Sequence, residues 1–145
     1  FHRTRPDDIG SDVRSRLNLG ALHLASSYIK AQRIRRRTQE NFAPTFKQLD
    51  VLAIPGVSIP APRLDATTVR LNKKDIPVGV ALTRCTRIFN LTGMPSVSVP
   101  VGLTKTGLPI GIQIAGRPFD EATVLRVAEA YERHVYRPEK WPIVN

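Results

Sequence analysis

The chain contains very little cysteine and histidine. Its 145 residues include one cysteine, Cys85, and three histidines that lie far apart in the sequence. A lone cysteine excludes an intrachain disulfide bond and is typical of a reducing compartment, so we expect a cytoplasmic protein. The scattered histidines do not have the spacing of metal ligands, so we expect no metal. No apolar run approaches the roughly 18 residues that span a bilayer, and we expect no membrane partner.

Motifs for nucleophilic catalysis and for phosphate binding are also missing. Ser96 and Ser98 do not lie in a G-x-S-x-G motif, and isoleucines interrupt the glycines of residues 107–116, which excludes a phosphate-binding loop. Cys85 with one of the scattered histidines is no better a candidate, because a free cysteine most often packs as a small apolar side chain. We therefore predict that the chain holds no catalytic residue and no cofactor.

Positive charge is abundant. The sequence has 22 Lys and Arg residues against 12 Asp and Glu residues, a net charge of +10. A run of arginines, Arg33 and Arg35 to Arg37, falls in a predicted helix. One hypothesis is a basic binding module that contacts nucleic acid. No aromatic residues are interleaved for base stacking, so we rank this hypothesis below a solvated or intersubunit surface whose acidic counterpart lies elsewhere in a longer protein.

The first half of the chain predicts helices followed by a strand. Residues 1–10 are interpreted as a tail or a severed connection, and residues 11–145 as part of a single domain. Ser11 or Asp12 can cap a first helix and Ser26 a second, which Pro44 should end near residues 42–43. Residues 51–54 are wholly apolar and predict a buried strand. The polar residues 63–77 predict a surface loop or a short hairpin around residues 72–75.

The second half predicts a helix, a strand hairpin and a last helix. Residues 80–89 have helical spacing and should end at Asn90 and Gly93. Residues 97–101 and 110–115 alternate as strands, and the short turn between them requires an antiparallel pair. Asp120 should cap the last helix, with Phe119 and Val124 as a hydrophobic staple. Further predictions for this helix are a core face of Val124, Leu125, Ala128, Tyr131 and Val135, and termination by Pro138 and Pro142.

Three segments carry a resemblance to a known family. Residues 86–116 read T-R-I-F-N-L-T-G-M-P-S-V-S-V-P-V-G-L-T-K-T-G-L-P-I-G-I-Q-I-A-G, which closely resembles the C-terminal signature of the amidase-signature family. Residues 50–55, with the A-P that ends at Pro62, resemble the family segment D-x-L-L-x-P. Residues 28–33 resemble the family helix Y-x-x-A-x-x-x-R, with the arginine shifted. The three segments occur in the family order, and the resemblance covers about residues 11–136.

The resemblance implies an α/β fold, a mixed twisted β-sheet flanked by helices, in an enzyme that hydrolyses or transfers carboxamide nitrogen. Family members use a serine nucleophile, a second serine in a cis peptide and a lysine, within a Gly/Ser-rich region that this chain lacks. We therefore expect the C-terminal part of an amide hydrolase, contributing sheet core and pocket wall without the catalytic residues. Its implied partners are the remaining N-terminal part of the enzyme, or a second copy, and a small-molecule amide. The alternative is an amidotransferase-subunit piece near nucleic acid.

The resemblance also implies substrate-binding residues. In relatives, the helix before the N-x-x-G-x-P motif lines the substrate cleft, and counting back from Asn90 selects Val80, Thr83 and Arg87. Helical periodicity independently places these three positions on one face. Some amidotransferase relatives carry an acidic residue at the position of Thr83, so threonine there argues against glutamine as substrate. Arg87 is expected either to pair with a substrate carboxylate or to form an interdomain salt bridge.

Overall fold

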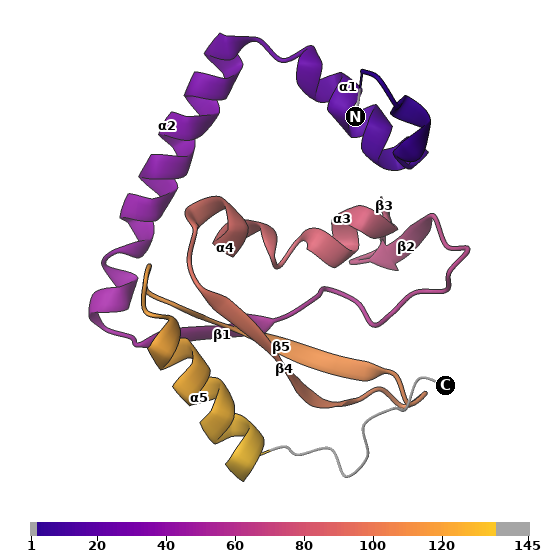
Figure 1. Cartoon of the computed structure of the whole chain (residues 1–145). Coiled ribbons are helices and arrows are strands. Elements are labelled where there is room, and N and C mark those ends of the chain that lie inside the picture. The colour runs from indigo at the N-terminus through magenta and orange to yellow at the C-terminus, as the bar shows by residue number, and fades with distance from the viewer. Residues whose placement is uncertain (1–2, 136–145) are drawn as a thin grey trace. The chain divides into compact units, whose positions relative to one another are not determined.

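The computed structural model (Figure 1) describes residues 3–135, which fall into two compact units divided between Thr38 and Gln39. The first unit contains a short 3-10 helix, η1 (Pro6–Asp8), then α1 (Ser11–Ala21) and most of α2 (Ala25–Phe42). Neither α1 nor α2 has a buried residue. No helix in the described part of the chain is long and apolar enough to cross a membrane.

Both predicted N-terminal helices are present, but they begin one or two residues before the positions that the expected caps imply, so Ser11, Asp12 and Ser26 lie inside the helices and not at their N-caps. The second ends at Phe42, two residues before Pro44, because a residue that precedes proline disfavours helical dihedral angles. Residues 6–8, which belong to the expected tail, form η1, and the Arg14 Nη1 atom donates a hydrogen bond to Asp7 Oδ1 at 2.9 Å. Part of the expected tail is therefore tied to α1.

The second unit is built on a three-stranded sheet. Its strands are β1 (Val51–Pro55), β4 (Ser96–Leu103) and β5 (Pro109–Gly116), in the order β1-β5-β4 with antiparallel pairing throughout. The predicted hairpin of β4 and β5 is therefore confirmed. In its turn, Thr104 Oγ1 accepts hydrogen bonds from the backbone N–H groups of Thr106 and Leu108, at 3.3 and 3.0 Å. The predicted α/β class is also confirmed.

The two faces of this sheet are covered by different elements. Helix α5 (Glu121–His134) packs on one face, where Val99, Ile114 and Ala128 are buried together. On the opposite face, Ala115 is buried against one residue that precedes β1 in the chain and two residues that follow it. The residues of that second cluster are Phe46, which lies in the 3-10 helix η2 (Thr45–Lys47), together with Phe89 and Met94. Figure 1 shows α5 and α4 on opposite sides of the strands.

A single arginine joins the end of β5 to the segment before β1. Arg117 Nε donates to the Phe46 carbonyl at 2.9 Å, and Arg117 Nη2 donates to the Leu49 carbonyl at 3.3 Å and to Asp50 Oδ1 at 3.0 Å. The guanidinium satisfies carbonyls that belong to no strand, and its ion pair with Asp50 is largely exposed. Arg117 therefore fixes where the chain enters the sheet.

The helix expected over residues 80–89 is two helices. Helix α3 (Val78–Thr83) and helix α4 (Arg87–Thr92) are separated by a turn over residues 84–86. Thr86 Oγ1 donates to the Thr83 carbonyl at 3.2 Å, a local side-chain bond of the kind that competes with helix continuation. Gly93 ends α4 in the left-handed conformation, with φ of 72°, as expected, whereas Asn90 lies inside the helix.

The polar residues 63–77 contain the predicted hairpin. Strands β2 (Thr68–Leu71) and β3 (Lys74–Pro77) pair antiparallel. The two residues between them, Asn72 and Lys73, both have positive φ angles of 51° and 64°. Positive φ at both central positions is characteristic of the tight turns that join paired strands. Of the two structures expected for this segment, the hairpin is therefore the correct one.

Three expectations about burial are wrong. Residues 51–54 form a strand, but three of them are only half-buried and Ala53 is exposed, because β1 is an edge strand of this sheet. Phe119 is 94% exposed with φ of 66°, so it cannot staple the helix through the buried Val124. Leu125 and Val135 are also exposed, although Val124 and Ala128 are buried as expected.

The start of α5 also differs from the capping prediction. Asp120 occupies the N-cap position, but its side chain makes no capping hydrogen bond. The helix ends at His134, which is before Pro138 and Pro142, and both prolines lie outside the described residues. The position of the helix was therefore predictable from its pattern, whereas the contacts at its ends were not.

We predict that Ile114→Ala lowers the free energy of unfolding by about 2–5 kcal/mol, because Ile114 is 2% exposed between β5 and α5 and its truncation leaves a cavity. Chemical denaturation of the wild-type and variant proteins measures this change. Ile110→Ala is the matched control, since Ile110 lies on the same strand but is 41% exposed. Equal losses in the two variants would contradict the described packing of this strand.

Candidate functional site

The expected substrate-binding residues lie on two helices, not one. Val80 and Thr83 belong to α3, whereas Arg87 is the first residue of α4. All three are exposed. Because the turn over residues 84–86 interrupts the helix, the regular spacing of these residues does not by itself place them on one face. They remain a candidate wall formed by two consecutive short helices.

The three residues of this candidate wall offer different groups to a ligand. Val80 is 39% exposed and offers apolar surface. The Thr83 hydroxyl donates to the Gly79 carbonyl at 2.7 Å, so its hydrogen is already engaged within the helix. Arg87 is exposed, and two positions along, Phe89 is buried against the sheet. Arg87 therefore lies on the face of α4 that is turned away from the core.

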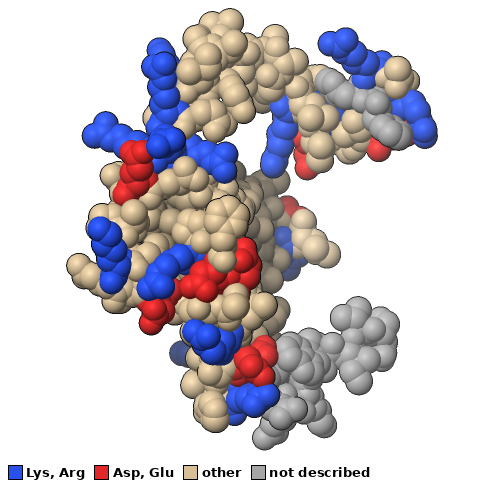
Figure 2. All heavy atoms as spheres, turned by 60° about the vertical axis from the view of Figure 1, so that its left-hand side comes forward, with Lys and Arg blue, Asp and Glu red and all other residues tan. Residues whose placement is uncertain are grey.

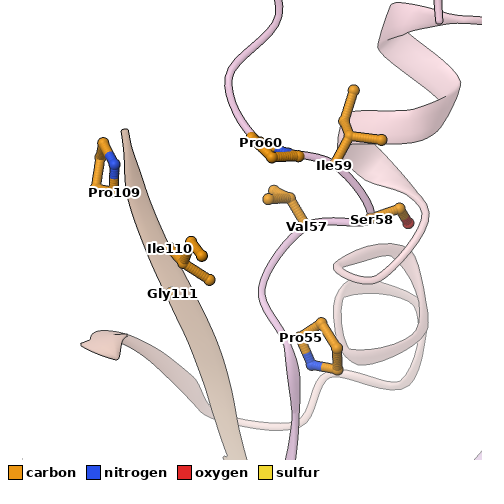
Figure 3. A pocket seen from close by; sticks show the side chains of 8 residues that line it. All are labelled: Pro55, Val57, Ser58, Ile59, Pro60, Pro109, Ile110 and Gly111. Carbon is orange, nitrogen blue, oxygen red and sulfur yellow. The ribbon is translucent and has the colours of Figure 1, made fainter. Parts of the chain in front are cut away.

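A small apolar cavity lies beside the C-terminal end of β1. It has a volume of about 170 Å³ and is formed by the loop after β1 and the first residues of β5. Figure 3 shows Val57 from the loop and Ile110 from β5 pointing toward one another, while Ser58 points away from the strand. This volume is below the range of about 300–1,000 Å³ that is usual for ligand pockets. The cavity does not include the three expected substrate-binding residues.

The backbones of β1, β5 and β4 approach one another closely beside this cavity. The Gly56 N–H donates to the Gly111 carbonyl at 3.0 Å, which extends the pairing of β1 with β5 by one residue. A Cβ atom at Gly56 would lie 3.2 Å from that carbonyl oxygen, and one at Gly111 would lie 3.3 Å from the Val99 carbonyl. Gly111 therefore lies where neighbouring backbones approach closely, beside the irregular pairing between Pro100 and Gly102.

The proline-rich loop also contacts the turn between α3 and α4. Ser58 Oγ lies 3.4 Å from Cys85 Sγ, and both residues are half-buried. Cys85 is therefore less buried than expected for an apolar core residue. Nothing in the sequence indicated that loop residues 55–60 line a cavity or contact Cys85. Their apolar side chains beside three prolines were the only available signal.

Neighbouring polar groups form local pairs and do not gather into a metal centre. In the same loop, Arg63 donates hydrogen bonds to both carboxylate oxygens of Asp65, at 3.1 and 3.3 Å. This guanidinium holds the pKa of the Asp65 carboxyl below its ordinary value. Within residues 3–135, no three His, Cys, Asp or Glu side chains gather closely enough to hold a metal ion.

A second hollow lies within the N-terminal unit. It has a volume of about 520 Å³ and is lined at the junction of α1 and α2 by Gly20, His23, Ser27, Tyr28 and Ala31. Tyr28 is 64% exposed, so the hollow is an open concave surface. Nearby on α2 are Lys30, Arg33 and the three arginines that follow, and Figure 2 shows Lys and Arg side chains projecting from this helical part of the chain.

Comparison with known proteins identifies the family. A family model described as "Amidase" matches residues 1–125. The chain belongs to the amidase family. A fatty acid amide hydrolase from Medicago truncatula is 41% identical over 132 residues, which are 91% of this chain and 22% of that protein. A glutamyl-tRNA(Gln) amidotransferase subunit from Myxococcus xanthus (strain DK1622) is 42% identical over 136 residues, which are 90% of this chain and 27% of that protein.

Solved structures agree on the fold. A crystal structure described as an amidase has a TM-score of 0.83 to this chain at 24% sequence identity, and the match covers 90% of this chain and 30% of that one. The chain therefore has the fold of one portion of an amidase. It spans 22% and 27% of the lengths of the two curated relatives above.

We predict that the Ser58–Cys85 contact stabilises the loop by no more than about 1 kcal/mol, because a thiol is a weak hydrogen-bonding partner. A double-mutant cycle of Ser58→Ala and Cys85→Ala, followed by chemical denaturation, isolates the coupling energy. Ser15→Ala serves as the control for loss of a serine hydroxyl, since Ser15 donates to the Ser11 carbonyl of its own helix. Strict additivity in the Ser58–Cys85 cycle would show that the contact contributes nothing.

Proposed function

We propose that the chain is the C-terminal part of an amide hydrolase that cleaves carboxamide C–N bonds. In this proposal the chain contributes sheet core and one wall of the substrate pocket, and the nucleophile belongs to polypeptide outside these 145 residues. The observation that carries the proposal is the match to the amidase family over residues 1–125 of a chain that covers only 22% of a fatty acid amide hydrolase. No serine–serine–lysine arrangement of the family type occurs in the sequence.

The pocket wall is assigned to Val80, Thr83 and Arg87. Two features support this assignment. All three side chains are exposed although α4 is anchored to the sheet through the buried Phe89, so a rigid core holds an open surface in place. In addition, α3 is fixed at its first residue by a hydrogen bond from the Val78 N–H to the Thr67 carbonyl at 3.0 Å. The wall is therefore anchored at both of its helices while its side chains stay open to a ligand.

The composition of this wall favours an amide that carries an apolar portion and a polar or anionic group. Val80 supplies apolar contact area. Thr83 has no carboxylate to bind an ammonium group, and its hydroxyl already donates to the Gly79 carbonyl within the helix. This argues against glutamine as substrate. Arg87 supplies a guanidinium, which pairs with a carboxylate through two parallel hydrogen bonds. The competing role for Arg87 is a salt bridge to another part of the enzyme, and kinetics on acidic and apolar substrates separate the two roles.

We expect the isolated chain to have no amidase activity, because pocket walls alone cannot supply the nucleophile of a covalent mechanism. The measurement is turnover of a simple aryl amide and of a short-chain carboxamide by the purified 145-residue chain. The intact enzyme, prepared from the complete coding sequence, is the positive control. Turnover by the chain that survives Cys85→Ala but is lost on Ser96→Ala or Ser98→Ala would reveal a catalytic serine in β4.

In the intact enzyme, Arg87→Ala should lower kcat/KM for acidic or strongly polar amides by at least about tenfold more than for neutral apolar amides, the size expected when a charge-assisted hydrogen bond is lost. Arg87→Lys should restore only part of the difference, because lysine keeps the charge but lacks the bidentate fork. Steady-state kinetics on a matched series of substrates measures both effects.

Arg84→Ala is the matched control for that series, since Arg84 is an exposed arginine in the turn between the same two helices. It removes an equal charge from the same surface. A loss of kcat/KM that is the same for acidic and apolar amides would assign Arg87 to a salt bridge within the enzyme. Equal selectivity changes in the two variants would indicate a general effect of surface charge.

A further inference from the structure

One buried amide in the centre of the sheet is only half satisfied. Gln113 lies in β5, between Ile54 of β1 and Ser98 of β4, and is 7% exposed. Its Nε2 atom donates to Ser96 Oγ at 3.3 Å, but its Oε1 atom has no hydrogen-bond partner among the described residues. Exchanging the amide oxygen and nitrogen would let Ser96 donate to the oxygen and would leave the nitrogen unpaired instead. One end of the amide lacks a partner in either orientation.

The residues around this amide divide the sheet face into two parts. Registers show that Leu52, Ile54 and Ala115 share the face with Gln113, and these three pack into the cluster around Phe89. Toward β4 the same face becomes polar, with the exposed Ser96 opposite Ala115 and the exposed Ser98 opposite Gln113. The α5 side of the same strands is apolar, with Val97, Val99 and Ile114. Ser96, Ser98 and Gln113, here called the polar row, therefore occupy part of one sheet face, whereas the opposite face packs apolar side chains against a helix.

Such a row suits a partner that brings hydrogen-bonding groups and not apolar side chains. Buried polar groups in folded proteins are almost always hydrogen-bonded, and leaving one unpaired is unfavourable. The serines beside Gln113 are short, so a polypeptide backbone can approach the sheet closely there. Most of the length of the curated relatives lies outside the region matched here, since the chain covers 22% and 27% of them. Backbone of the same enzyme is therefore the candidate occupant.

We propose that the polar row Ser96, Ser98 and Gln113 docks a backbone segment of the amidase polypeptide that lies outside these 145 residues, with Gln113 Oε1 accepting a hydrogen bond from a backbone N–H of that segment. The inference rests on one part of the proposed function, namely that the chain is a portion of a larger polypeptide of the amidase family, and it does not require that this polypeptide hydrolyses an amide. It goes beyond that function by naming the groups that fix the rest of the enzyme to this sheet face.

The test uses the intact enzyme and measures backbone hydrogen exchange by mass spectrometry. Gln113→Met keeps the length of the side chain and removes both polar ends. It should increase exchange by at least about tenfold in one peptide outside the 145 residues, because that amide loses its acceptor. Ser96→Ala, at an exposed position that does not endanger folding, should increase exchange in the same peptide by a smaller factor, because the Gln113 amide loses the bond that orients it.

The matched control is Gln39→Leu. Gln39 also donates its amide to a backbone carbonyl, that of Thr92 at 2.8 Å, but both partners lie within this chain. Its exchange effects should therefore stay within residues 39–92. If Gln113→Met changes hydrogen exchange only in β1, β4 and β5, or changes none outside the 145 residues, the proposal is overturned. A buried water would then be the hydrogen-bond partner of the Gln113 amide. Exchange in the outside peptide that responds only when a substrate-like amide is bound would overturn it as well.

This readout does not depend on turnover. If the intact enzyme hydrolyses no amide but the outside peptide loses protection in Gln113→Met, the docking proposal stands and the proposed function fails. If the enzyme is active and the peptide is unaffected, the docking proposal fails alone. In the active case, a drop in kcat at constant KM for Gln113→Met would place the docked segment beside the reacting groups, while unchanged kinetics would place it elsewhere on the sheet.

Discussion

Antiparallel pairing on both edges of β5 organises the three-stranded sheet on which α5 and the cluster around Phe89 pack. The strand is bonded to β1 over Val51–Pro55 and to β4 over Ser96–Leu103, so its backbone groups are satisfied from both sides. Its side chains then alternate between two different environments. Ile112 and Ile114 pack on the α5 side, whereas Ala115 packs into the cluster around Phe89 and Gln113 lies on the same sheet face as Ala115. Because the side-chain period of a strand is two, a slip of one residue would place a glutamine under α5 and is strongly disfavoured.

The ends of β5 make this register rigid. At its C-terminal end, a Cβ atom on Gly116 would lie only 2.5 Å from Val124 Cγ2, so the absence of a side chain lets α5 pack close to the strand. The next residue, Arg117, binds two carbonyls and one carboxylate of the segment that leads into β1. At its N-terminal end, Gly111 passes close to the backbone of β4 beside the irregularity at Pro100–Gly102. Close backbone approach and one guanidinium therefore set both limits of the strand.

The distribution of apolar surface agrees with a chain that spans only part of the length of its curated relatives. Helices α1 and α2 contain no buried residue, and the apolar Leu22, Leu24 and Ile34 in and beside them are each more than half exposed. Amphipathic helices gain most of their stability from packing an apolar face against other elements. Phe119 adds a second example, since it is almost fully exposed in a left-handed conformation that is costly for a large side chain. Each of the two units therefore exposes apolar side chains that its own described residues do not cover.

The sequence by itself determined the order and type of the main elements, because strand alternation over residues 97–101 and 110–115 and the glycine and proline punctuation are local signals. It also determined the family, through motifs that depend on residue identity. Only the tertiary structure decided that β1 is an edge strand, that the helix before Asn90 is broken so that Arg87 begins a second helix, and that Phe119 is exposed and does not cover Val124. The burial of a side chain and the face that a short helix buries depend on residues distant in sequence. Those contacts produce no periodic pattern in the local sequence. The half-satisfied amide of Gln113 is of the same kind, since its partners are set by strand register and not by the residues beside it.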